Sequence, residues 1–156
     1  MSQKRVPAIF MRGGSSKGVF FHSSDLPEDK NSWDKLFLSV LGSPDPYGRQ
    51  LNGMGGGISS LSKAVVISPP TRLDADVDYT FAQISVKDSV VDYSSNCGNL
   101  SSAVGPFAID TGLVDASGIT KEVRIHNTNS GKLIVSKVPL RLSLIHISEP
   151  TRQDRI

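Results

Sequence analysis

The one cysteine of the sequence, Cys97, lies where a thiol can be reactive. It follows the polar residues Ser94–Asn96 and precedes a segment, 100–108, that we expect to be helical. The first N–H groups of a helix have no acceptor within the helix and the helix dipole is positive there, so this position stabilises a thiolate. The alternative is a buried structural cysteine, which is what most lone cysteines are.

Lys63 is the second residue whose surroundings suggest chemistry. It stands between a Gly/Ser-rich tract and the apolar run 64–67, which is expected to be a buried strand. Partial burial of a lysine favours its neutral amine, which can act as a general base. A surface lysine at a strand edge is the alternative, and the sequence leaves it open. A thiol at a helix end and an amine at a strand end together resemble an acid/base pair.

Three Gly/Ser-rich tracts, 13–18, 52–60 and 94–99, interrupt the apolar runs and are therefore expected to be loops on a scaffold. Their backbone N–H groups and hydroxyls suit carboxylate or phosphate oxygens. None has the residue order of a Walker loop or of a dinucleotide-binding loop. Arg12 and Lys17 flank the first tract and can pair with an anionic substrate, although a solvated surface charge is the commoner case.

Composition limits the other kinds of site. His22 and His126 are not spaced as ligands relative to each other or to carboxylates, so no metal site is expected. A single cysteine excludes an internal disulfide and a multi-cysteine zinc site. The 17 basic and 15 acidic residues leave a charge of only +2 without a basic cluster, which disfavours nucleic acid as a partner. Because no long apolar segment or signal core occurs, we expect a cytoplasmic protein.

The elements that must position these residues follow an α+β pattern. Apolar residues at helical spacing predict helices over 32–41 and 100–108, the first ended by Gly42 and the second kinked by Pro106. Strands are predicted at 6–11, 19–22, 64–67, 79–86, 123–126 and 133–135. The first two strands flank the first Gly/Ser tract, and the last two form a hairpin.

The end of the sequence looks foreign. Residues 142–152 read LSLIHISEPTR, which resembles the translation of an adapter used to build sequencing libraries, and 153–156 would then be read-through. A native polar tail is the alternative. On the adapter interpretation, residues 1–141 form one native domain of a truncated protein, because a domain seldom ends directly after a strand.

Three motifs, taken together, resemble the PrpF family, which includes 2-methylaconitate cis-trans isomerase, 3-methylitaconate delta-isomerase and 4-oxalomesaconate tautomerase. The motifs are MRGGSSKG at 11–18, LNGMGGG at 51–57 leading to SSLSK at 59–63, and NCGNL at 96–100 leading to VGPFA at 104–108. The resemblance implies the diaminopimelate epimerase fold, in which two similar α+β halves enclose the active site. Each half is a curved, mostly antiparallel sheet wrapped around a central helix, and this chain resembles the N-terminal half only.

The resemblance also implies roles for the two reactive residues. Lys63 falls on the family's catalytic lysine, which removes a proton allylic to a carboxylate-bearing double bond. Cys97 falls on its active-site cysteine, which returns a proton or holds the substrate. Loop N–H groups at 57–60 and 98–99 would stabilise the charge of a dienolate. The expected substrate-binding residues are Arg12, Ser15, Ser16, Lys17, Gly56, Gly57, Ile58, Ser59, Ser60, Asn96, Gly98 and Asn99.

The function expected of the full-length protein is a cofactor-independent isomerase of unsaturated di- or tricarboxylates, such as the 2-methylaconitate of propionate metabolism. Diaminopimelate epimerase uses two cysteines, one from each half, so the one cysteine here argues against amino-acid epimerisation. Neither a cofactor, a metal, a nucleic acid nor a membrane is expected as a partner. The partners that we do expect are the missing C-terminal half and further copies of the chain. The alternatives are a keto-enol tautomerase of the 4-oxalomesaconate type and an inactive fragment that binds small anions.

Overall fold

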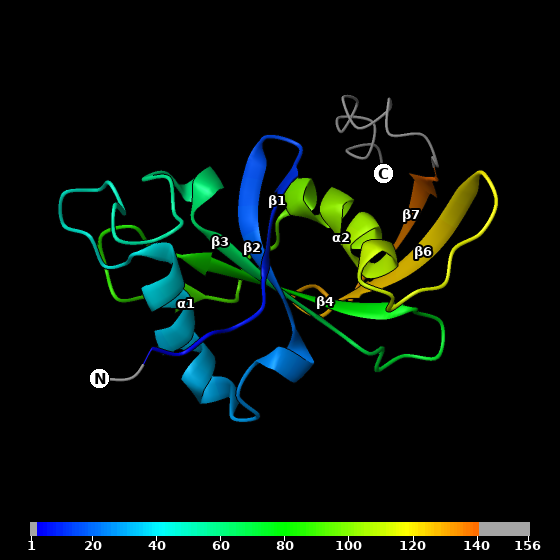
Figure 1. Ribbon diagram of the computed structural model, residues 1–156, viewed down its shortest axis with the longest axis horizontal. Coiled ribbons are helices and arrows are strands. Elements are labelled where there is room, and N and C mark those ends of the chain that lie inside the picture. Colours follow the sequence, from blue (N-terminus) through cyan, green and yellow to red (C-terminus); the bar gives the residue numbers. More distant parts are fainter. Residues whose placement is uncertain (1–2, 141–156) are drawn as a thin grey trace.

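The computed structural model describes residues 3–140, and the segment 142–156, for which we predict a foreign origin, lies outside them. Within the described part of the chain, seven strands form one mixed sheet, and two α-helices pack against it (Figure 1). The predicted α+β class is therefore confirmed.

The sheet has a mostly antiparallel order. Its strands are β1 (Ile9–Gly13), β2 (Ser16–His22), β3 (Lys63–Ser68), β4 (Val77–Ile84), β5 (Val91–Asp92), β6 (Thr120–Asn127) and β7 (Leu133–Pro139). They are hydrogen-bonded in the order β1-β2-β3-β4-β6-β7, and the short β5 pairs with β4. The pairs β2–β3 and β4–β6 are parallel, and the other four pairs are antiparallel. The predicted mostly antiparallel sheet is thus confirmed.

The two α-helices lie on opposite faces of this sheet. They are α1 (Trp33–Leu41) and α2 (Gly98–Asp110), and three short 3-10 helices accompany them, η1 (Ser23–Asp25), η2 (Lys30–Ser32) and η3 (Ser59–Leu61). Figure 1 shows the sheet curving around α2, with β1 and β2 on one side of the helix and β6 and β7 on the other. This confirms the predicted sheet wrapped around a central helix.

Alternate residues of the central strands face two different hydrophobic clusters. On β3, Val65 and Ile67 belong to the cluster around α2, whereas Ala64 and Val66 belong to the cluster around α1. A strand covered on both faces carries apolar residues without alternation. The prediction of a buried strand from the continuous run 64–67 is confirmed for this reason.

The helix α2 passes through the interior of the molecule. Every residue from Leu100 to Ala108 is buried, so the middle of the helix has no solvent-exposed face. A Cβ atom added to Gly105 would lie 2.7 Å from Val138 Cγ2 and 3.0 Å from Ser136 Oγ, so this glycine allows the close approach of α2 to β7. The helix continues past Pro106 for another turn, and the kink expected at this proline stays a prediction.

The first Gly/Ser tract differs from its prediction as a loop. Most of it lies in β1 and β2, and only Gly14 and Ser15 form the turn between them. Gly14 has a φ of 53°, which suits the first position of a two-residue hairpin turn. The prediction was wrong because small residues are also needed where a strand lies close to a helix. A Cβ at Gly13 would lie 2.5 Å from the Asn99 carbonyl oxygen of α2.

The remaining boundaries differ by a few residues. The strand β4 begins and ends two residues before the predicted 79–86, and β6 and β7 are longer than predicted. The two residues of β5 give no periodicity, so the strand was not predicted. Gly42 ends α1 with a φ of 81°, as expected. None of the helices within 3–140 is long and apolar enough to cross a membrane.

Candidate functional site

Lys63 and Cys97 come from distant parts of the sequence and contact each other directly. Lys63 Nζ lies 3.2 Å from Cys97 Sγ and 3.0 Å from Ser16 Oγ. Lys63 is only 8% exposed and Cys97 only 6%. The amine also lies over the Phe81 ring, 5.6 Å from its centroid. The structure therefore brings the two predicted residues together, and Lys63 is not a surface lysine at a strand edge.

The sheet positions the lysine. Lys63 is the first residue of β3, an interior strand between β2 and β4, and its side chain faces α2, as that of Val65 does. Its partner across the antiparallel pair with β4 is Gln83. Gln83 Nε2 donates to the carbonyl oxygens of Ser59 and Ser62, at 2.9 Å each, and so fixes the turn that leads into β3.

Cys97 is the N-cap residue of α2, as predicted for a helix-terminal thiol. Its Sγ accepts a hydrogen bond from the Leu100 N–H at 3.4 Å, and its carbonyl oxygen accepts one from the Tyr79 hydroxyl at 3.0 Å. Burial raises the pKa of Tyr79, and a negative charge on Cys97 raises that pKa further. The phenol is therefore a neutral hydrogen-bond donor, and the thiol has a backbone N–H directed at it.

Other predicted site residues gather at the start of α2. Asn99 Nδ2 donates to Ser15 Oγ at 3.2 Å, which ties the β1–β2 turn to the helix. Ser16 Oγ lies 3.8 Å from Cys97 Sγ. A Cβ added to Gly98 would meet no atom within 4 Å, so the backbone beside the thiol faces open space. The Leu100 N–H is taken up by Cys97 Sγ, so the donors that the first helical turn offers to an anion here are the N–H groups of Gly98 and Asn99.

Arg12 and Lys17 lie away from the Lys63 amine. They are directly opposite each other in the β1–β2 hairpin, and such partners share one face of a sheet. Because side chains alternate along a strand and Ser16 faces α2, Lys17 and Arg12 face the other side. Both are exposed, and Arg12 Nε donates to the Gly14 carbonyl oxygen at 2.9 Å. The structure does not bring them to the reactive pair, and their substrate contact stays a prediction.

A buried glutamine that the sequence did not reveal organises the loop before β3. Gln50 is 1% exposed, and its Nε2 donates to the hydroxyls of Ser43 and Ser62 at 2.8 and 2.7 Å. Its Oε1 accepts the N–H of Gly57 at 2.9 Å. The Gly57 N–H thus already has Gln50 Oε1 as its acceptor, and a substrate oxygen would have to displace that glutamine oxygen.

The rest of this loop is more open. The Gly56 N–H donates to the Leu61 carbonyl oxygen at 3.1 Å. Ile58 and Ser59 are exposed and Ser60 is partly exposed, and η3 packs against β2, the strand that begins with Ser16. These residues lie beside the strand that carries Lys63, and their substrate contacts stay predictions.

Asn96, predicted to bind substrate, is exposed beside Cys97, and its Oδ1 accepts a hydrogen bond from Nδ2 of the buried Asn127. Asn127 was not identified as a site residue from the sequence, and neither were Tyr79 and Phe81. Tyr79 and Phe81 are two residues apart on β4, so both side chains lie on the face of the strand that carries the site. Strand register is therefore the signal that identifies them. No local signal identifies Asn127, because it begins what reads as an ordinary polar turn.

His126 lies beside a carboxylate, although its spacing in the sequence had indicated that it was isolated from carboxylates. Its Nδ1 lies 2.9 Å from Asp78 Oδ1, and the Thr71 hydroxyl donates to the other oxygen of this carboxylate at 2.7 Å. The parallel pairing of β4 with β6 sets Asp78 opposite His126. Within residues 3–140 no group of three or more His, Cys, Asp or Glu side chains is arranged to hold a metal ion.

The fold is shared with solved structures of isomerising enzymes. The crystal structure of a methylitaconate-delta-isomerase matches with a TM-score of 0.86 at 50% identity, over 90% of this chain and 36% of that chain. A hydroxyproline epimerase from Agrobacterium vitis matches with a TM-score of 0.60 at 13% identity, over 91% of this chain and 40% of that chain. The second likeness shows the fold alone, which is of the proline racemase and diaminopimelate epimerase type.

The family model described as PrpF protein matches residues 3–148, so the chain belongs to the PrpF family. It is 53% identical to a 2-methyl-aconitate isomerase from Cupriavidus necator, over 88% of this chain and 37% of that protein. It is 47% identical to a 3-methylitaconate isomerase from Eubacterium barkeri, over 99% of this chain and 40% of that protein. It is 46% identical to a 4-oxalomesaconate tautomerase from Pseudomonas putida, over 100% of this chain and 43% of that protein. The chain therefore spans well under half the length of these relatives.

Proposed function

We propose that this chain supplies the base and the acid of a cofactor-independent isomerase, which shifts a proton in unsaturated di- or tricarboxylates such as 2-methylaconitate. The observation that supports this most directly is the contact of 3.2 Å between Lys63 Nζ and Cys97 Sγ. The names of the relatives at 53% and 47% identity support the substrate class. Because the chain spans a minor part of those relatives, the activity is proposed for a longer protein whose further part completes the site.

The reaction conserves electrons and protons without a co-reactant. The neutral amine of Lys63 removes a proton from the carbon allylic to the double bond, and the C–H electron pair spreads into a dienolate with the carboxylate. The Cys97 thiol gives a proton to the other end of the allylic system, and the double bond has moved. Lys63 then carries one extra proton and Cys97 lacks one. Transfer from Nζ to Sγ across 3.2 Å restores both groups.

The surroundings of the pair suit this chemistry. The dienolate carries its charge on carboxylate oxygens, and the amides of Gly98 and Asn99 at the start of α2 are donors for such oxygens. The burial of Lys63 and Cys97 limits competing proton exchange with bulk water. The hydroxyl of Ser16, 3.0 Å from Nζ, holds the amine beside the thiol.

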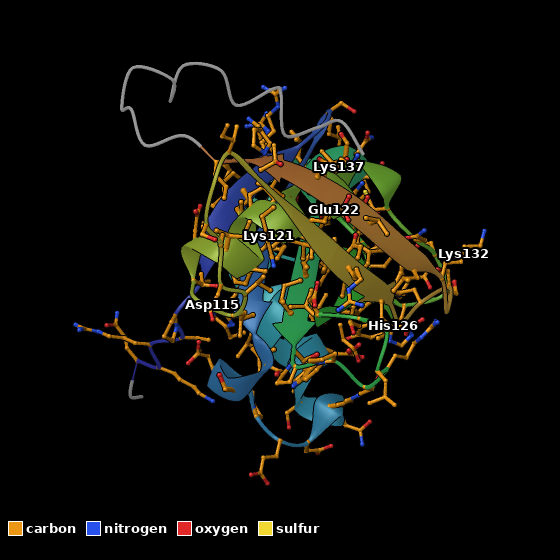
Figure 2. The ribbon with its side chains drawn as sticks, turned by 90° about the vertical axis from the view of Figure 1, so that its right-hand side faces the viewer. Asp115, Lys121, Glu122, His126, Lys132 and Lys137 are labelled. Atoms are coloured by element: carbon orange, nitrogen blue, oxygen red, sulfur yellow. The ribbon has the colours of Figure 1, made fainter. Side chains whose placement is uncertain are left out.

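The decisive variant is Lys63→Ala in the gene extended past codon 141. With 2-methylaconitate in D2O, the unaltered enzyme is expected to isomerise the substrate and exchange its allylic proton, both of which NMR detects. Loss of a positioned base lowers kcat by roughly 100- to 10,000-fold. Lys137→Ala is the matched control, because its side chain is 76% exposed on β7 (Figure 2). Full activity in Lys63→Ala would eliminate Lys63 as the base.

A keto-enol tautomerase is the second candidate, because a 4-oxalomesaconate tautomerase is similar over all of this chain at 46% identity. The same base and acid would serve, since a tautomerase also moves a proton next to a conjugated carbonyl. Comparison of kcat/KM for the two substrates in the extended protein distinguishes the candidates. The third possibility, a non-catalytic anion-binding module, requires that the chain of 156 residues binds cis-aconitate in calorimetry and converts none of it.

A further inference from the structure

A chain of side-chain amides connects the β6–β7 hairpin to the residue before Cys97. Asn127, the last residue of β6, is 0% exposed. Its Oδ1 accepts the backbone N–H groups of Asn129 and Ser130 at 2.9 and 3.2 Å. Its Nδ2 donates to the Oδ1 of Asn96. Every polar atom of the Asn127 side chain is thus engaged, and one of them holds a predicted substrate-binding residue.

The backbone fixes the direction of these hydrogen bonds. An amide nitrogen donates and does not accept, so the atom of Asn127 that faces two N–H groups must be its oxygen. The NH2 group of Asn127 must then face Asn96, and Asn96 must offer its oxygen in return. The NH2 group of Asn96 is thereby turned away from Asn127. Asn96 itself is exposed and directly precedes Cys97, and a Cβ added to the following Gly98 would meet no atom within 4 Å.

The same hairpin fixes the segment that ends at Cys97 at a second point. Asn129 Nδ2 donates to the carbonyl oxygens of Tyr93 and Phe81, at 2.8 Å each, and its Oδ1 accepts the Phe81 N–H at 2.7 Å. The Tyr79 hydroxyl adds a third attachment, at the Cys97 carbonyl oxygen. The backbone on which Asn96 stands is therefore held to β4 and β6, and rotation of its side-chain amide is the freedom that Asn127 removes.

We propose that Asn127 is a positioning residue that sets Asn96 as a hydrogen-bond donor, through its NH2 group, to a carboxylate of the substrate. The inference rests on the proposed function, because it assigns the donor to the same site. A carboxylate accepts hydrogen bonds and does not donate them, so an Asn96 turned the other way would present an oxygen and repel it. The fold thus selects an anionic group at this place.

Asn127→Asp tests the inference with almost no change of shape. One oxygen of the new carboxylate still accepts the N–H groups of Asn129 and Ser130, and the other now faces Asn96 in place of an NH2 group. Asn96 must rotate to donate to it, and its oxygen then faces the substrate. KM for 2-methylaconitate in the extended protein is expected to rise roughly 10- to 100-fold, the effect of losing a hydrogen bond to a charged group.

The rotation itself is visible without any substrate. In the unaltered protein the NH2 protons of buried Asn127 exchange slowly with water and those of exposed Asn96 exchange fast, which NMR of the labelled chain resolves. In Asn127→Asp the Asn96 protons become hydrogen-bonded, and their exchange slows about 10-fold. A purely structural role of Asn127 would not produce this change.

Two further variants complete the test. Asn96→Asp keeps Asn127 satisfied and presents an oxygen to the substrate, so it should raise KM as Asn127→Asp does, at an exposed position where folding is not at risk. Asn31→Asp adds the same charge at an exposed residue of η2 and should leave KM unchanged.

The outcomes separate the two proposals. Unchanged exchange of the Asn96 protons in Asn127→Asp would overturn the positioning role. Rotation without a rise in KM would overturn the donor role. Failure of the proposed isomerase would appear earlier, as absence of turnover in the unaltered extended protein.

Discussion

Lys63 is a buried polar residue whose side-chain partners are all supplied by other elements. The amine contacts Ser16 from β2, Cys97 from the start of α2 and the ring of Phe81 from β4. A buried ionisable group without partners is costly, so these contacts are what allows a lysine to stay inside the sheet. At the scale of single residues, the site depends on hydroxyls, amides and one aromatic face placed around two reactive atoms.

Tyr79 offers a test at this scale. Removal of its hydroxyl in Tyr79→Phe deprives the Cys97 carbonyl oxygen of a donor and leaves the ring in place. We expect a loss of about 1 kcal/mol in the free energy of unfolding, measured by urea denaturation, because a net hydrogen bond contributes that much.

Tyr47→Phe is the control for this variant, because Tyr47 is 85% exposed. Its midpoint in urea should equal that of the unaltered protein. An equal midpoint for Tyr79→Phe would show that the hydrogen bond to Cys97 contributes nothing to stability.

Among the elements, α2 is the one whose packing depends most on small residues. Its middle is buried on all sides, and Gly105 faces β7 where a Cβ would come within 2.7 Å of Val138. A glycine inside a helix costs about 1 kcal/mol relative to alanine when nothing else changes. The close approach to β7 outweighs this preference.

Gly105→Ala should therefore destabilise the protein, although alanine favours helices. Overpacking of a core costs about 1 to 3 kcal/mol, and the nearest atom belongs to a branched side chain with little freedom to move. Gly98→Ala is the matched control, since a Cβ there meets nothing within 4 Å, and it should be neutral or stabilising in the same urea measurement. Equal effects of the two substitutions would contradict the packing argument.

At the scale of the whole molecule, one sheet separates two hydrophobic clusters that share its strands. Trp33, the one tryptophan of the sequence, belongs to the cluster around α1, and Cys97, the one cysteine, to the cluster around α2. The chain therefore carries a natural probe in each cluster. Because alternate residues of β3 enter both clusters, we expect that neither cluster unfolds while the other stays intact.

We expect the two probes to report one transition. The urea midpoint from Trp33 fluorescence should coincide with the midpoint from the extent of Cys97 labelling by a thiol reagent, as a two-state molecule requires. Labelling in full denaturant gives the upper limit of the second signal. Midpoints that differ beyond error would mean that the two clusters unfold separately.

Local sequence signals were enough to predict the order and kind of most elements and to single out the two reactive residues. These features depend on local properties, such as the spacing of apolar residues in α1, the continuous apolar run of β3 and the position of Cys97 before a helix. The predicted boundaries were wrong where the local signal was weak, as at the glycine that ends β1, and the two residues of β5 were not predicted as a strand.

The contacts between distant residues became known only from the folded chain. The contact of Lys63 with Cys97, the placement of Arg12 and Lys17 on the opposite face, and the hydrogen bond of Asn127 to Asn96 all depend on sheet order and strand register. A shift of one residue in register moves every side chain of a strand to the other face, so these contacts carry no signal in the local sequence. The residue types set what chemistry is possible, and the pairing of distant strands decided where it can occur.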